Sequence, residues 1–111
     1  MTIALVQLPH ISEGDVEVVA IDYTPYLDSG ELLTGTPTAT EQTTSDLTLL
    51  SVAVNTASLT ILGNTAAIGA AVQFKVSGQL LATGEYSILV TAATDATIPR
   101  TKKVVAKFRV V

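Results

Sequence analysis

The chain has 111 residues, a net charge of −4 and no cysteine. This length suits one domain, residues 1–111, in which about 60 to 70% of the surface of the unfolded chain is buried. The lack of cysteine excludes a disulfide framework, a thiolate metal site and a cysteine nucleophile. Charged residues make up only 14% of the chain, and we therefore expect part of its surface to be covered by a neighbouring molecule.

The N-terminal residues predict a short edge strand. Residues 2–7 alternate weakly and are followed by Pro9, which cannot donate a hydrogen bond to a strand ladder. The segment lacks a positively charged start, and its apolar run ends at Gln7, which argues against a signal peptide and a membrane span. We therefore expect a protein that begins at Met1 and is not exported by the usual route.

The second predicted strand begins in an acidic segment. Residues 12–15 have the composition of a turn, and residues 16–21 alternate as a strand. Glu13, Asp15 and Glu17 recur with the two-residue period of one strand face. Residues 1–46 contain eight acidic residues and no Lys or Arg. This acidic half and the negative net charge predict that nucleic acid is repelled rather than bound.

A connection and a threonine-rich strand follow. Pro25 and the turn residues Asp28–Gly30 predict a tight connection over residues 22–31. In the strand predicted over residues 32–40, threonine stands at every second position from Thr34 to Thr40. A solvated strand face is the simpler interpretation, and a threonine array that binds a flat lattice such as ice or sugar is the alternative.

The middle of the chain predicts three more strands, over residues 47–54, 58–62 and 72–76, separated by turns at Asn55–Ala57 and Gly63–Asn64. Five of the six residues at positions 66–71 are Ala or Gly; the exception is Ile68. The run 65–71 is the one place where the sequence allows a helical turn.

A tyrosine marks the start of the strand around which the chain is organised. Gly84 provides a turn position, and alternating residues then run through the strand 85–93. The spacing of Gly84, Tyr86 and Ile88 resembles the tyrosine corner of immunoglobulin-like sandwiches, in which the tyrosine hydroxyl binds upstream backbone. Ile88 stands where antibody domains have their second cysteine. We therefore predict an all-β fold, an immunoglobulin-like β-sandwich of seven or eight strands with no disulfide.

The last predicted strand, residues 102–111, carries a basic stripe. Its even-numbered positions from 104 onward are apolar, while Lys103, Lys107 and Arg109 share the opposite face. These cations complement Glu13, Asp15 and Glu17. We expect the acidic and basic groups to lie close together, either within one subunit or across a subunit boundary. Their pairing should fix the alignment of the two surfaces more than it strengthens the contact.

Catalytic chemistry has little support in the sequence. His10 is the only histidine, it lies beside Pro9 in a predicted turn, and no nucleophile motif accompanies it. Loop carboxylates that could gather around calcium are Asp22, Asp28, Glu31 and Asp95, but no stretch has the dense acidic spacing of a calcium loop. Dispersed glycines exclude a phosphate loop. We expect no enzyme activity, no cofactor and no metal.

The segment Asp22–Leu32, Asp-Tyr-Thr-Pro-Tyr-Leu-Asp-Ser-Gly-Glu-Leu, followed by a Thr-rich strand, resembles a group of small virion structural proteins of tailed bacteriophages. In these an extended Asp-aromatic-x-Pro-Tyr-Leu-x-x-Gly-Glu/Asp segment precedes a Thr/Ser-rich sandwich. Tyr23 and Tyr26 stand in place of the Trp often found near it. The resemblance implies an immunoglobulin-like accessory component of the particle, at the capsid surface, neck or tail, with no catalytic residues.

We therefore expect a non-catalytic virion protein, assembled in the host cytoplasm as a homo-oligomer on capsid, portal, adaptor or tail proteins, with no nucleic-acid or membrane partner. The alternative is a free immunoglobulin-like adhesion or carbohydrate-binding module that uses end loops around Asp28 and Asp95. Sugar binding usually needs an exposed aromatic platform. Tyr23, Tyr26 and Tyr86 are few and are expected to be buried.

Overall fold

The computed structural model describes residues 4–111, which form nine strands and one short 3₁₀ helix, η1 (Thr24–Tyr26). The strands are β1 (Ala4–Gln7), β2 (Glu17–Asp22), β3 (Leu33–Glu41), β4 (Thr48–Val54), β5 (Leu59–Ile61), β6 (Asn64–Ala66), β7 (Ala71–Ser77), β8 (Glu85–Thr94) and β9 (Thr101–Arg109). The start of the first predicted strand, residues 2–7, lies outside the described residues.

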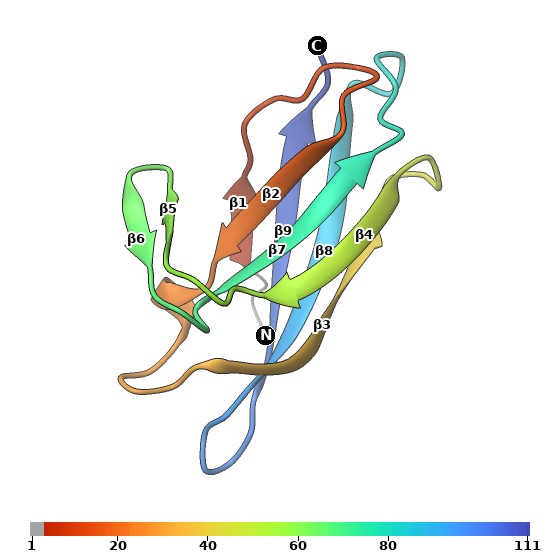
Figure 1. The fold of residues 1–111 in the computed structure, drawn as a ribbon. Coiled ribbons are helices and arrows are strands. Elements are labelled where there is room, and N and C mark those ends of the chain that lie inside the picture. Colours follow the sequence, from red (N-terminus) through yellow and green to blue (C-terminus); the bar gives the residue numbers. More distant parts are fainter. Residues whose placement is uncertain (1–3) are drawn as a thin grey trace.

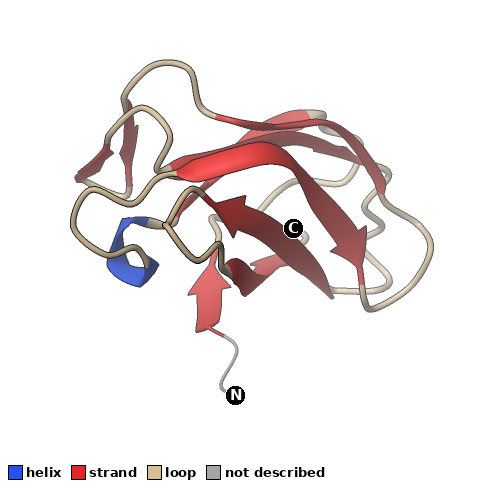
Figure 2. Ribbon diagram, turned by 90° about the horizontal axis from the view of Figure 1, so that it is seen from below, coloured by secondary structure: helices blue, strands red, loops and turns tan. Residues whose placement is uncertain are grey.

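Seven of these strands pack as a two-layer sandwich (Figure 1, Figure 2). One layer is a four-stranded sheet in the order β1-β9-β8-β3, and the other has the order β2-β7-β4. Neighbouring strands are antiparallel, except that β1 runs parallel to β9. Strands β1 to β4 alternate between the two layers, and β7 is followed by β8 and β9 in the other sheet, which is the arrangement of an immunoglobulin-like sandwich. The predicted all-β fold is therefore confirmed.

The strand count is higher than the predicted seven or eight because the sequence analysis did not predict β6, which pairs with β5 in a separate hairpin. Leu59 lies opposite Ala66, and the hairpin stands beside the sandwich on the side of β2 (Figure 1). Its two turn residues, Leu62 and Gly63, have φ of 50° and 83°, the left-handed geometry that directs a chain into a tight hairpin. The run 65–71, the one place where the sequence allowed a helical turn, holds the end of β6 and then a turn closed by Ala70 N–H donating to Ala67 O at 3.0 Å. The helical turn in the described residues lies instead at Thr24–Tyr26, so this expectation was wrong.

The core lies between the two layers and is built by alternate residues of the central strands. On β8, Tyr86, Ile88 and Val90 are fully buried, as the predicted alternation requires. Side chains at most 1% exposed on other strands are Ile21, Val72, Phe74, Val76, Val104, Ala106 and Phe108. Each of these Val, Ile and Phe side chains contributes about 1.5–3 kcal/mol on burial, and the methyl group of Ala106 contributes less, so core packing holds together a chain that has no disulfide.

Tyr86 forms the corner between the loop before β8 and the body of the sandwich. Its hydroxyl accepts a hydrogen bond from the backbone N–H of Leu80 at 2.9 Å and donates one to Asp46 Oδ2 at 2.9 Å. The ring stacks on Phe108, with centroids 5.5 Å apart. A bond from a buried tyrosine at the start of this strand to upstream backbone is the geometry of a tyrosine corner.

Candidate interaction surfaces

The outer face of the four-stranded sheet carries the predicted basic stripe. On β9, Val104, Ala106 and Phe108 are buried, whereas Lys103 and Arg109 are exposed and Lys107 is partly exposed. A row of apolar side chains crosses the same face, because Leu5 on β1 and Leu89 on β8 both lie opposite Val105. Leu5 is 66% exposed. Val105 and Leu89 are partly exposed, so this face combines cations with an apolar row that is exposed at Leu5 and half-buried at its other two positions.

The acidic segment lies mainly in a turn rather than on a strand. β2 begins only at Glu17, so the sequence was right about a turn at residues 12–15 and wrong to place Glu13 and Asp15 on an alternating strand. The physical reason is the buried side chain of Gln79, whose Nε2 donates to the carbonyl oxygens of Ser12 and Asp15 at 2.8 and 2.7 Å. These bonds fold the backbone back before β2 starts.

The backbone of the acidic segment lies close to the end of β9, but the charged side chains of the two groups do not pair. Ile11 N–H donates to Arg109 O at 2.9 Å, and Glu13 N–H donates to Val111 O at 3.2 Å. The Glu13 carboxylate, however, accepts a bond from Leu81 N–H at 2.8 Å. Within residues 4–111 every ion pair is made by Arg100, so none joins the acidic segment to β9. Pairing across a subunit boundary stays a prediction.

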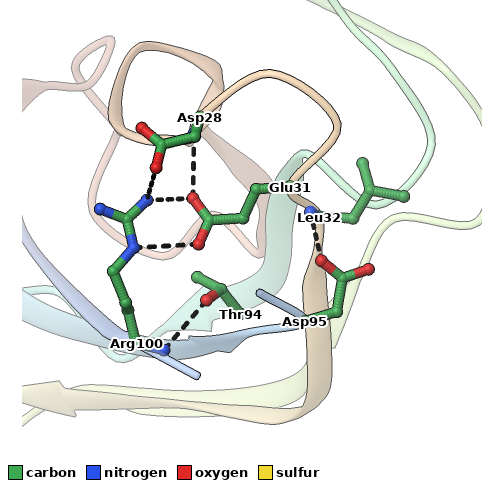
Figure 3. A network of polar contacts seen from close by, with 6 residues as sticks. All are labelled: Asp28, Glu31, Leu32, Thr94, Asp95 and Arg100. Atoms are coloured by element: carbon green, nitrogen blue, oxygen red, sulfur yellow. Dashed lines mark hydrogen bonds and ion pairs between the residues drawn. The ribbon is translucent and has the colours of Figure 1, made fainter. Parts of the chain in front are cut away.

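Arg100 instead organises the end of the sandwich where β8 ends and β9 begins (Figure 3). Its Nε donates to Glu31 Oε2 at 3.0 Å, its Nη2 donates to Glu31 Oε1, and Nη2 lies 3.1 Å from Asp28 Oδ2. Glu31 is only 6% exposed. The hydrogen bonds from Arg100, aided by the Asp28 N–H, lower the pKa of Glu31 to about 2, and the same bonds raise the pKa of Arg100.

Sequence reasoning missed this cluster because its members are 69 residues apart. The available signal was charge: the acidic turn 28–31 and Arg100 both lie in predicted end loops. The loop carboxylates considered for calcium have protein donors here, since Asp95 Oδ1 accepts from Leu32 N–H at 2.8 Å and Asp22 Oδ1 from Thr24 N–H at 2.9 Å. In the described part of the chain, no three His, Cys, Asp or Glu side chains gather as metal ligands.

The fold also decides whether the tyrosines and the threonine row could form a binding surface of a free module. Tyr23 and Tyr86 are fully buried and Tyr26 packs against the core, which leaves no tyrosine as a platform for sugar. Burial raises the pKa of Tyr23, and its hydroxyl donates to Val90 O at 2.8 Å. The row from Thr34 to Thr40 is exposed, but the register of β3 shifts between Thr34 and Thr38, so the hydroxyls do not form one flat array.

A groove of about 520 Å³ runs beside β2, between the two layers. Its walls come from the segment after β1, from β2 and from the β5–β6 hairpin. Among the residues that line the groove are Leu8, His10, Glu17, Val18, Asp22 and Leu62. The single histidine, considered above as a catalytic base, thus sits in the wall of an open groove.

Comparison with protein-family models, with curated proteins and with solved structures finds no match to this chain. No helix in residues 4–111 is long and apolar enough to cross a membrane. The surfaces therefore have to be interpreted from their own chemistry.

Proposed function

We propose that this chain is a non-catalytic structural component of a bacteriophage particle, which assembles in several copies on other virion proteins at the capsid surface, neck or tail. Its function is adhesion between protein surfaces. The observation that carries the proposal is the outer face of the four-stranded sheet, where an exposed Leu5 and the partly exposed Val105 and Leu89 form an apolar row among the cations of β9. The resemblance of Asp22–Leu32 to small virion proteins supplies the assignment to a particle.

The character of this face supports a protein partner. Burying an exposed leucine against a neighbour yields about 1.5–3 kcal/mol, whereas a surface ion pair yields about 0–1 kcal/mol. The apolar row would therefore provide affinity, and Lys103, Lys107 and Arg109 would provide orientation. A nucleic-acid partner is disfavoured, because the molecule as a whole is acidic and no aromatic side chain stands among these cations.

Separation of the charges also supports assembly in several copies. Although their backbones lie close together, the acidic segment 13–17 and the basic stripe form no ion pair with each other within residues 4–111, so neither neutralises the other there. Complementary surfaces on one molecule favour head-to-tail contacts, which generate rings or filaments, over two-fold contacts that would bring equal charges together. Such contacts would suit a component present in repeated positions on a particle.

The test is incorporation into particles. A tagged copy of the chain, produced during phage growth in the source strain, should co-purify with particles through a density gradient and be detected there by mass spectrometry. The double variant Lys107→Glu, Arg109→Glu should be incorporated several-fold less, because it reverses the stripe.

The matched control is Lys75→Glu, which reverses an exposed cation on the outer face of the other sheet and should be incorporated normally. Circular dichroism confirms that both variants fold. Accumulation of the wild-type chain only in the soluble fraction would overturn the proposal, and equal incorporation of the double variant would exclude a role for the stripe.

A further inference from the structure

Within residues 4–111, β2 is the edge strand of the sandwich with the longest uninterrupted register, and the β5–β6 hairpin lies beside part of it. Within the described residues β1 covers four residues, and it is followed by Pro9. β3 and β4 each carry a shift in register that interrupts the edge. β2 pairs with β7 through six residues without a break and contains no Pro or Lys. Regular, uncovered edges invite pairing with another strand, and proteins normally blunt them.

The hydrogen bonds between β2 and β7 leave alternate backbone groups directed away from the sheet. Tyr23 N–H donates to Ala70 O at 2.8 Å, and the antiparallel register continues back to Glu17 opposite Val76. Hydrogen-bonded and non-hydrogen-bonded pairs alternate in such a ladder. The odd-numbered residues therefore bind β7, and the N–H and C=O groups of Val18, Ala20 and Asp22 point to the free edge.

The groove described above lies along this free edge. Val18 is 62% exposed, and Leu62, which closes the groove from the hairpin, is 68% exposed. Leu62 also has φ of +50°, a conformation that costs a residue with a Cβ about 1–2 kcal/mol. A large apolar side chain in this turn position is unfavourable for the hairpin alone, which points to a use in the groove.

The charges around the edge select the kind of strand that fits. Among the described residues, the charged side chains of the groove wall are the carboxylates Glu17 and Asp22, at the two ends of β2; Lys75, the cross-strand partner of Val18, is exposed but is not part of the lining. Glu13 and Asp15 extend the negative charge beyond one end. Two β2 strands paired antiparallel would bring acidic ends together, which is destabilising. A second copy joined through this edge is therefore disfavoured, and a cationic segment is favoured.

We infer that β2 and its groove form a binding site for an extended segment of a partner protein, which adds to the sheet as a fourth strand beside β2. The segment would form main-chain hydrogen bonds with Val18 and Ala20, place alternate apolar side chains in the groove and carry Lys or Arg near its ends. This site goes beyond the structural role proposed above and does not depend on the assignment to a particle.

The probe for this site is a fluorescein-labelled peptide, Lys-Val-Thr-Val-Thr-Val-Lys, with both ends blocked. Fluorescence anisotropy with the full chain should show saturable binding at concentrations up to about 1 mM. Ala20→Pro should weaken binding at least tenfold, because it removes an edge N–H that β7 does not use, and proline is tolerated at such positions. Glu17→Lys should weaken binding several-fold.

The matched control is Glu85→Lys, an equal change of charge on β8 of the other sheet, which should bind like the wild type. Two further peptides, N-methylated on the odd or on the even backbone nitrogens, test the edge without altering the protein. The peptide whose methylated nitrogens face away from β2 should retain binding. The peptide whose methylated nitrogens face β2 should lose it. No binding of the parent peptide, equal binding by folded Ala20→Pro, or equal effects of both methylation patterns would overturn the inference.

Discussion

Gly78 follows β7 at a point where the loop before β4 leaves no room for a side chain. A Cβ on Gly78 would lie 2.5 Å from the carbonyl oxygen of Asp46, and the residue has φ of +86°. Gly84 has a similar φ of +82°, but no heavy atom lies within 4 Å of its Cβ position. Comparison of the two glycines therefore separates steric overlap from backbone strain.

We expect Gly78→Ala to destabilise the chain by about 2–5 kcal/mol, the sum of left-handed strain and overpacking. Gly84→Ala should cost only the strain, about 1–2 kcal/mol. Urea unfolding followed by circular dichroism measures both. Equal losses for the two variants would show that the Asp46 backbone moves aside without cost.

At the scale of elements, the β5–β6 hairpin is attached to the sandwich by one buried amide. Asn55 is 2% exposed, and its Nδ2 donates to the carbonyl oxygens of Ala57 and Ala67, both at 2.9 Å. Its Oδ1 accepts from the N–H groups of Gly69 and Ala71 at 3.0 Å. The root of the hairpin is therefore fixed, while its tip contains the unfavourable left-handed Leu62.

Leu62→Asn should stabilise the chain by about 0.5–1 kcal/mol, because asparagine followed by glycine suits a turn with two left-handed residues. The same variant should weaken peptide binding in the groove. Leu81→Asn is the control, since Leu81 is also exposed but has no positive φ; it should not gain stability. A loss of stability in Leu62→Asn would mean that the side chain packs on the sandwich.

At the scale of the whole molecule, two polar contacts close opposite ends of β8. Tyr86 binds Leu80 and Asp46 at the start of the strand, and the Arg100–Glu31 pair joins the two end loops beyond Thr94 (Figure 3). The Tyr86–Asp46 and Arg100–Glu31 contacts join segments that are 40 and 69 residues apart in sequence. The Arg100–Glu31 pair can be tested by varying the pH, because the pKa of Glu31 is lowered from 4.5 to about 2.

A carboxyl group whose pKa is lower in the folded than in the unfolded state stabilises the fold above its unfolded pKa. The contribution of Glu31 should therefore be complete above pH 4.5 and be lost as the pH falls towards 2. We expect Glu31→Gln to lower the melting temperature at pH 7 and the difference from wild type to shrink between pH 4.5 and 2. Thermal unfolding across this range measures it. A difference independent of pH would exclude the ion pair as the cause.

Local patterns predicted the parts of the fold that depend on local geometry. Alternation identified the buried faces of β8 and β9, and the spacing Gly84–Tyr86 predicted a corner whose hydroxyl bonds are present in the structure. The acidic turn was placed partly on a strand, because the buried Gln79 that folds it is 64 residues from Asp15. Arg100 and Glu31 were not paired for the same reason: a sequence period carries no information about distant partners.

By itself, then, the sequence determined a cysteine-free chain of alternating strands that needs a two-layer core. It also places most acidic residues in the first part of the chain and most basic residues in the last. Only the tertiary structure decided that β1 joins β9 rather than β2, which leaves β2 as a free edge beside a groove. The physical reason is that a two-residue period assigns side chains to faces, whereas the choice of neighbouring strand depends on how both layers pack together.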